Sequence, residues 1–420
     1  MSASTARNGV VRLAGPRLPA VSLLARLPAA LCPTGTLLMV TALGGVARAG
    51  LVAGLLWAGQ AVGGPPIGRL ADRRGHRPVL LAASAANALL TAALVLAAVG
   101  RLPLPVQAGA ALLTGVTVPQ VGPLSRTRWI RLADRRPDGP ALIGSALSFD
   151  AIMDETSFVL GPALAGILAW AVHPAAGLVC AAALMAVFGT LFALHPTTPV
   201  AAPRTARGHR LHSAPLALLF VLIAMQGAVF GATNTGVQDL TRGGGGIGGV
   251  VWSAMGVTSA GAGLLLASFA ERFDLTVRLR TSMAAQALLC LTLLLVRGPV
   301  GAALSIAGIG FAVAPTLIAL FGLAERTVPA DRMGEAMTLL GSSMIAGQGL
   351  SVVLAGALAG RHGYPAAFAV TCTAAALALL LALALARPAR YAPRRPAAQP
   401  AAGLPAQPAG DANSTVTPIG

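Results

Sequence analysis

Long apolar stretches, separated by short polar turns, run along almost the whole chain. Most of the twelve stretches are close to the roughly 20 residues with which an α-helix crosses a lipid bilayer. They cover residues 20–43, 49–68, 78–99, 104–124, 142–170, 173–194, 214–236, 248–270, 281–297, 300–323, 335–360 and 365–386. The pattern predicts an all-α integral membrane protein with twelve transmembrane helices.

Polar segments divide these stretches into two groups of six. The longest internal one covers residues 195–213 and is rich in Pro and Arg. We therefore expect an N-terminal six-helix bundle at residues 1–194, a cytoplasmic linker at 195–213 and a C-terminal six-helix bundle at 214–386. The tail at 387–420 is rich in Pro and Ala, and we expect disorder there because it cannot bury a core.

The composition agrees with a membrane protein. Of 420 residues, 55% are hydrophobic and 10% are charged, whereas a soluble domain carries about 25% charged residues. A charge content this low over this length excludes a large soluble enzyme.

The arginines predict the topology. There is no lysine among the 30 basic residues; alternate loops and the termini carry 24 arginines, the intervening loops carry five, and Arg26 lies inside the first stretch. The positive-inside rule places the arginine-rich loops and both termini in the cytoplasm. Because Arg and Ala codons are GC-rich, the composition indicates a bacterial inner (plasma) membrane. The net charge of +17 then reflects topology and attraction to anionic lipid, and not nucleic-acid binding.

Several activities are excluded by missing residues. A Walker A loop needs a lysine, so the chain has no conventional way to hydrolyse ATP. The four cysteines lie in four different apolar stretches, without metal or redox spacing. We expect no enzyme activity, no cofactor and no metal site.

A cationic turn between the second and third stretches carries the clearest motif, GRLADRRGHR at residues 68–77. It resembles the loop motif of the major facilitator superfamily, with His76 where an arginine is usual. The resemblance implies two six-helix bundles, with substrate held between them near mid-membrane. It implies a cytoplasmic gate at this loop, in which Asp72 meets the start of the eleventh helix, and contact between the second and eleventh helices across the bundles. The gate residues are Gly68, Asp72, Arg73, Gly75 and Arg77.

The two groups of helices also look like repeats. Residues 144–168 align with residues 334–358 at an offset of 190 positions, and Gly, Ala and Leu coincide at several of them. This favours the same two-bundle architecture.

Three acidic residues lie well inside one stretch, at Asp150, Asp154 and Glu155. Such carboxylates are costly in lipid and are functional candidates. Asp150 and Asp154 share one helix face, so one of them is a candidate proton carrier, and Glu155 faces elsewhere. The alternative is structural: Arg26 lies at a similar depth in the first helix, so that an Arg26–Asp150 ion pair neutralises both. The two interpretations are compatible.

Further along the same stretch, residues 161–166 (GPALAG) resemble part of the antiporter motif of exporters in this superfamily. Pro162 removes a helix hydrogen bond, and Gly161 and Gly166 thin the helix, which predicts a bend and a close contact. The resemblance favours export over uptake. The fourth stretch departs from exporters, because Arg126 and Arg128 occur only at its cytoplasmic end.

A few polar or aromatic side chains complete the candidates. The family geometry places the first, fourth, seventh and tenth helices around the substrate, which selects Gln120, Gln226 and Asn234 as cavity residues. Trp129 and Trp170 lie at the ends of stretches, as membrane-interface anchors do.

These observations predict a secondary active transporter that exports a small, largely apolar molecule in exchange for protons by alternating access. The alternatives are a facilitator or importer of a metabolite, and a membrane scaffold that does not transport. The expected partners are a small-molecule substrate and membrane lipid, and we expect a monomer.

Overall fold

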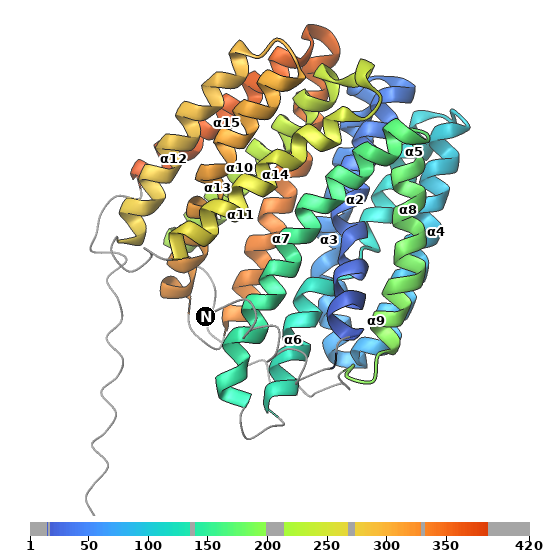
Figure 1. Ribbon diagram of the computed structural model, residues 1–420, viewed down its shortest axis with the longest axis vertical. Coiled ribbons are helices and arrows are strands. Elements are labelled where there is room, and N and C mark those ends of the chain that lie inside the picture. Colours follow the sequence, from blue (N-terminus) through green and yellow to red (C-terminus); the bar gives the residue numbers. More distant parts are fainter. Residues whose placement is uncertain are drawn as a thin grey trace, which may run out of the picture.

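The computed structural model describes residues 15, 17–134, 139–198, 214–267, 274–328 and 332–384, which form helices and no strands (Figure 1). The helices of the first half are α2 (Arg17–Gly44), α3 (Val46–Arg74), α4 (His76–Val99), α5 (Leu104–Val116), α6 (Val121–Asp134), α7 (Gly139–Ala171), α8 (Ala176–Leu184) and α9 (Thr190–Leu194). Those of the second half are α10 (Ala214–Leu240), α11 (Ile247–Ala267), α12 (Leu275–Leu291), α13 (Pro299–Thr327), α14 (Met333–His362) and α15 (Tyr364–Ala384). Eleven of the described helical segments are long and apolar enough to cross a membrane.

The remaining crossing, the fourth, differs from the sequence prediction. It is not one helix over residues 104–124 but two, α5 and α6, separated by residues 117–120 and continuing to Asp134. Pro119 explains the interruption, because proline lacks an N–H and disfavours helical backbone in the residue before it. The sixth crossing is continuous but contains a π-helical turn at Met185–Gly189.

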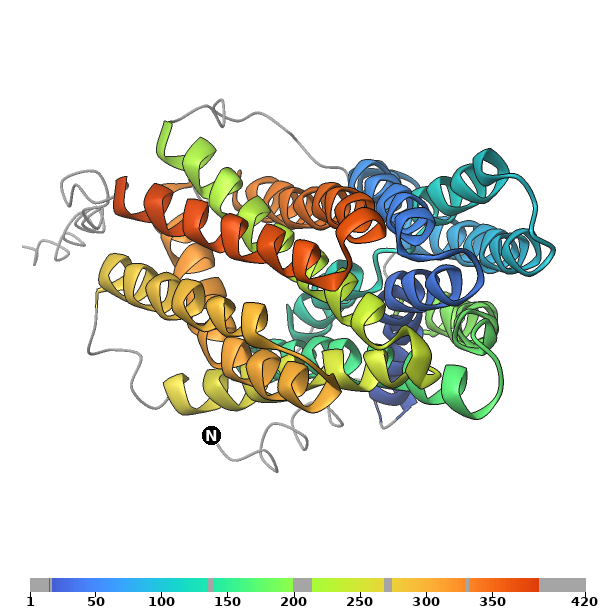
Figure 2. The ribbon, with the colours of Figure 1, turned by 90° about the horizontal axis from the view of Figure 1, so that it is seen from above.

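The helices pack as two six-span bundles, α2–α9 and α10–α15, which lie side by side in both views (Figures 1 and 2). The most extensive contacts between them join α3 to α14 and α7 to α11. The linker residues 199–213 and the tail at 387–420 lie outside the described residues. We call the end of the bundles at which α3 ends and α4 begins the arginine-rich end, and the opposite end the arginine-poor end.

Close backbone contact between the bundles occurs in their arginine-poor halves. A Cβ added to Gly50 of α3 would lie 2.8 Å from Gly356 Cα of α14, and one added to Gly166 of α7 would lie 3.0 Å from Gly249 Cα of α11. Small residues allow helices to approach this closely in lipid. The predicted contact between the second and eleventh helices is therefore confirmed. Two other α3 glycines, Gly59 and Gly63, pack on α5 of their own bundle instead.

The same helices separate toward the arginine-rich end. A Cβ added to Gly68 of α3 or Gly341 of α14 would meet no atom within 4 Å, and the same holds for Gly144 of α7 and Gly261 of α11. Among the described glycines, those that touch the other bundle lie in the arginine-poor halves. The bundles are thus closed at one end and apart at the other.

Candidate functional site

A cluster of charged side chains joins α2, α6 and α7. We call Arg26, Arg126, Asp150 and Asp154 the charge cluster. Arg26 Nη2 donates to Asp150 Oδ1 at 2.5 Å, and both side chains are buried. Arg26 Nε also lies 3.1 Å from Asp154 Oδ1. The structure therefore brings together the arginine and both aspartates of the sequence analysis.

Asp150 is held firmly within this cluster. Besides Arg26, it accepts hydrogen bonds from Ser125 Oγ at 2.7 Å and from Trp129 Nε1 at 3.0 Å. Its side chain is only 1% exposed. Three donors from two other helices, Arg26, Ser125 and Trp129, thus fix the position of this carboxylate. Asp150 is therefore suited to a structural role.

Asp154, one turn further along α7, is less enclosed. It contacts Arg26 and forms an ion pair with Arg126 Nη2. Asp154 is 21% exposed and Arg126 is 50% exposed, in contrast to the buried Arg26–Asp150 pair. Arg126 Nε also lies 3.4 Å from Asp150 Oδ2. The cluster thus has one enclosed carboxylate and one that solvent can reach.

The contribution of α6 to this cluster was missed in the sequence analysis. The predicted stretch ends at residue 124, which puts Arg126 and Trp129 at a membrane boundary. Instead α6 continues to Asp134, and Trp129 is 1% exposed, not an interface anchor. The signal was present as Ser125 and Trp129, four residues apart and hence on one helix face, the same spacing as that of Asp150 and Asp154.

Glu155 points away from the cluster. It follows Asp154 by one residue, which is about 100° around the helix, and its side chain is exposed. It lies on the face of α7 that packs on α11 further along the chain, since Pro162 and Val159 of that face contact Gly249 and Gly256. Of the three acidic candidates, the structure brings two into the charge cluster and leaves the third exposed on another face of α7.

The predicted gate residues lie in the last two turns of α3, at Gly75 and in the first turn of α4. Gly75 ends α3 and precedes α4 with φ 91°, a left-handed conformation that favours glycine. Arg73 and Arg77 are exposed. Asp72 Oδ1 is 4.0 Å from Nε2 of the buried His76. The contact of Asp72 with the eleventh helix remains a prediction.

A buried arginine also stabilises the arginine-rich end of the first bundle. Arg128 of α6 is buried, lies 3.9 Å above the Phe192 ring, and donates to Phe192 O and Thr198 Oγ1, both at 3.1 Å. Burial, followed by the positive charge of Arg128, lowers the pKa of His195 beyond the end of α9. His195 is therefore neutral at pH 7.

The segment predicted to bend α7 is a packing point. Gly161 faces α2, where an added Cβ would lie 2.8 Å from Ala30 Cβ. Gly166 and the Pro162 carbonyl face α11 of the other bundle. The two bundles can therefore touch here because Gly166 leaves room for the backbone of α11.

The three predicted cavity residues have different surroundings among the described residues. Gln120 lies in the break of the fourth crossing and donates to Val118 O at 3.3 Å, and Gln226 is 1% exposed. Asn234 of α10 donates to Thr34 Oγ1 of α2 at 3.4 Å and accepts from Gln238 at 3.0 Å. Asn234 therefore bridges the bundles where they are closed.

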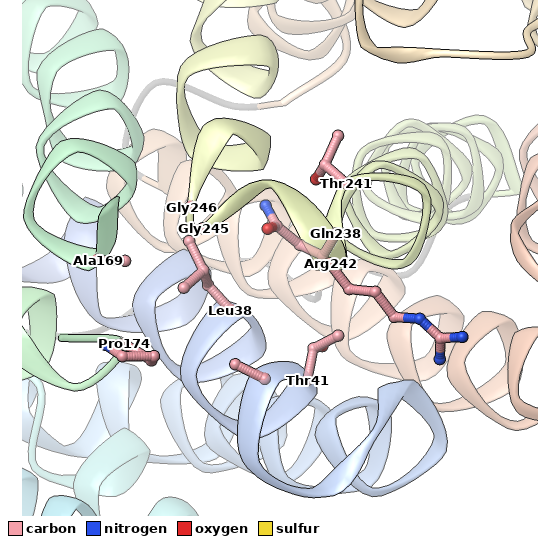
Figure 3. A pocket seen from close by; sticks show the side chains of 10 residues that line it. Leu38, Thr41, Ala169, Pro174, Gln238, Thr241, Arg242, Gly245 and Gly246 are labelled. Atoms are coloured by element: carbon pink, nitrogen blue, oxygen red, sulfur yellow. The ribbon is translucent and has the colours of Figure 1, made fainter. Parts of the chain in front are cut away.

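A small pocket marks that closure. Leu38 and Thr41 of α2 line it together with Gln238, Thr241 and Arg242 at the end of α10 (Figure 3). Its volume is about 40 Å³, room for a few water molecules and far below the ~300 Å³ of a small ligand site. This pocket is therefore too small to hold a substrate.

The described residues contain no group of three or more His, Cys, Asp or Glu side chains able to hold a metal ion. The polar chemistry of the site is that of ion pairs and hydrogen bonds.

Comparisons with known proteins agree with this architecture. Residues 28–341 match the family model described as the Major Facilitator Superfamily. A crystal structure of a point mutant of the nucleoside transporter NupG is similar with a TM-score of 0.69 and 15% identity, over 88% of this chain and 99% of that one. The POT family transporter PepTSo is similar with a TM-score of 0.68 and 12% identity, over 88% and 96%.

The xylose transporter XylE from E. coli, in a partially occluded inward open conformation, gives a TM-score of 0.61 and 13% identity, over 88% of this chain and 97% of that one. The search of curated proteins found no match. At these identities the structures show the fold alone, whereas the family model covers most of the sequence. This chain, an integral membrane transporter and not an enzyme, belongs to the major facilitator superfamily.

Proposed function

We propose that the protein exports a small, largely apolar molecule from the bacterial cytoplasm in exchange for protons, by alternating access. The arginine-rich end is then the cytoplasmic end, with both termini inside, in the inner membrane. The two units that move are residues 1–194 and 214–386. On this basis the structure represents the state that is open to the cytoplasm and closed outside.

The proposal rests on the different burial and hydrogen bonding of two neighbouring aspartates, Asp150 and Asp154. Asp150 is buried and accepts hydrogen bonds from three donors of α2 and α6, whereas Asp154 is partly exposed beside Arg126. With both aspartates ionised, the charge cluster is neutral. Protonation of Asp154 would leave one positive charge in excess and weaken its attraction to Arg126. Proton binding therefore changes the forces that join α6 to α7.

The test is transport into proteoliposomes with and without an imposed pH gradient, in the wild type and in Asp154→Asn. For the wild type we expect substrate movement that the gradient drives. Asp154→Asn should abolish gradient-driven movement but retain exchange of labelled for unlabelled substrate, because the substitution removes the titrating group and keeps the fold. Gradient-driven transport by Asp154→Asn equal to that of the wild type would refute the role of Asp154.

Uptake is the second candidate. The similar structures include a nucleoside transporter and a xylose transporter, so the fold is compatible with a metabolite as substrate. The GPALAG segment, which packs against the other bundle, favours export. The same proteoliposomes separate the two directions, because export in exchange for protons and uptake together with protons respond oppositely to reversal of the gradient.

A further inference from the structure

A second cavity opens at the arginine-poor end, between the two bundles; we call it the outer cavity. The turn between α2 and α3 forms one wall and contributes the side chains of Val46 and Ala47, and the ends of α10 and α14 form the other wall. Its volume is about 390 Å³, within the range of roughly 300–1,000 Å³ that is typical of ligand sites. Proton-driven export as proposed above gives this cavity no role.

Glycines at its rim keep the outer cavity free of side chains. Gly45 and Gly363 turn the chain after α2 and α14 with φ of 84° and 75°, a left-handed conformation that favours glycine. Gly360 lies at the edge where the bundles touch, since a Cβ added there would be 2.7 Å from Ala47 Cβ. The outer cavity therefore borders the closed seam, and its two walls belong to the two bundles.

Asp239 and Arg242 line the outer cavity with opposite charges. The Asp239 side chain is 7% exposed and that of Arg242 is 65% exposed, with its guanidinium extending away from Leu38 (Figure 3). Asp239 Oδ1 and Arg242 Nη1 are 3.8 Å apart, too far for a hydrogen bond. The backbone N–H of Tyr364 is a further polar neighbour of Asp239. Because a carboxylate can accept about four hydrogen bonds, both charged groups retain capacity for a ligand.

The two charged groups together suit a zwitterion. Arg242 would repel a simple cation held by Asp239, and Asp239 would repel a simple anion held by Arg242. A molecule whose ammonium group donates to Asp239 and whose carboxylate accepts from Arg242 satisfies both. Because the two side chains are only 3.8 Å apart, the ammonium and carboxylate groups must be neighbours in the ligand, as in an α-amino acid. Val46 and Ala47 of the same cavity suit an apolar side chain on that ligand.

We propose that the outer cavity binds an apolar α-amino acid, and that this ligand holds the arginine-poor end closed. Its charged groups bind to the second bundle and its side chain packs on the first, so that it bridges the two. Opening of the arginine-poor end would draw the walls apart and break one set of these contacts. A ligand that prefers one conformation shifts the population toward it. The amino acid is thus a regulator that slows transport, and it is distinct from the exported molecule.

The test is binding of labelled leucine to the purified full chain. Leucinamide, which lacks the carboxylate, and 4-methylpentanoate, which lacks the ammonium group, are the matched competitors. We expect each to compete about tenfold more weakly than unlabelled leucine, because each loses one charge-assisted pair. Asp239→Asn and Arg242→Gln should each weaken leucine binding by about the same factor. Arg101→Gln is the control, because Arg101 is an exposed arginine in the turn after α4 at the same end.

A conformational readout tests the bridge between the bundles. A thiol introduced at Ser148, an exposed position of α7 near the arginine-rich end, should react faster when leucine is bound. Saturating glycine, which has the charged groups but no side chain to reach Val46 and Ala47, should leave the rate unchanged. A rate that leucine does not raise would refute the regulatory role.

Competitors that match leucine, or leucine binding that is unchanged in both Asp239→Asn and Arg242→Gln, would overturn the assignment of the site. The comparison of competitors uses the wild type alone, so it decides the question even where a variant fails to fold. None of these results depends on proton coupling, which Asp154→Asn tests separately.

Discussion

At the scale of single residues, the decisive contrast lies between Asp150 and Asp154. Both belong to one face of α7, yet Asp150 is enclosed by Arg26, Ser125 and Trp129, while Asp154 reaches solvent beside Arg126. Removal of one partner from a buried ion pair leaves the other charge without compensation. Asp150 should therefore matter for stability, and Asp154 for coupling.

Asp150→Asn should destabilise the protein by roughly 3–5 kcal/mol, because Arg26 would remain charged and buried without its closest partner. Thermal unfolding of the purified protein in detergent would measure this as a lower midpoint. Addition of Arg26→Gln to the same variant should recover part of the loss. Glu325→Gln provides the control, since that carboxylate is exposed. An unchanged midpoint in Asp150→Asn would show that the pair does not stabilise the fold.

The sequence predicted much of this site, and the reasons for its failures are physical. The Arg26–Asp150 pairing follows from equal depth in two helices that run in the same direction. The roles of Arg126 and Trp129 were not predicted, because the first charged residue was taken as the end of the apolar helix. Arginines can continue a helix when acidic partners lie on a neighbouring helix. The hydrogen bond of Asn234 to Thr34 of the other bundle depends on which end of the bundles is closed, and no sequence pattern encodes one conformational state.

At the scale of helices, the two seams α3–α14 and α7–α11 determine which end is shut. Both rest on glycines in the arginine-poor halves, where neighbouring backbones leave no room for a Cβ. The glycines of the arginine-rich halves have open space around them. In each seam, the two helices therefore touch in their arginine-poor halves and are apart in their arginine-rich halves.

Gly356→Ala should destabilise the observed conformation, because its Cβ would lie 2.7 Å from Gly50 Cα, a backbone atom that cannot move without shifting a helix. Gly341→Ala on the same helix should have no such effect, since its Cβ would meet open space. Reaction of a thiol introduced at Ser148, an exposed position of α7, would report the open population. We expect slower reaction in Gly356→Ala than in Gly341→Ala. Equal rates in the two variants would argue against the seam as the closing contact.

The interruption of the fourth crossing could not be predicted from the length of the apolar stretch. Apolar length predicted one helix, but Pro119 divides it, and α6 then reaches down beside α7 with Arg126 and Trp129. The number of crossings was nevertheless predicted, because α5 and α6 together span the membrane once.

At the scale of the whole molecule, the arginine distribution and the two-bundle architecture combine into a topology. Arg77 follows the turn between α3 and α4, and Arg101 follows α4 at the other end; both are exposed. In intact cells, a membrane-impermeant maleimide should label Arg101→Cys, whereas Arg77→Cys should react only after permeabilisation. Labelling of Arg77→Cys in intact cells would reverse the assignment of inside and outside.

The account as a whole depends on reciprocal motion of the two bundles. Spin labels at Ser148 of α7 and Leu264 of α11 would report the arginine-rich end, and labels at Val172 and Val300 the arginine-poor end; all four positions are exposed. When the pH is lowered, protonation of Asp154 should favour closure at the arginine-rich end. We expect the first distance to shorten while the second lengthens, and Asp154→Asn to shift both in this direction at alkaline pH. Distances that stay fixed at every pH, or that change in the same sense at both ends, would contradict it.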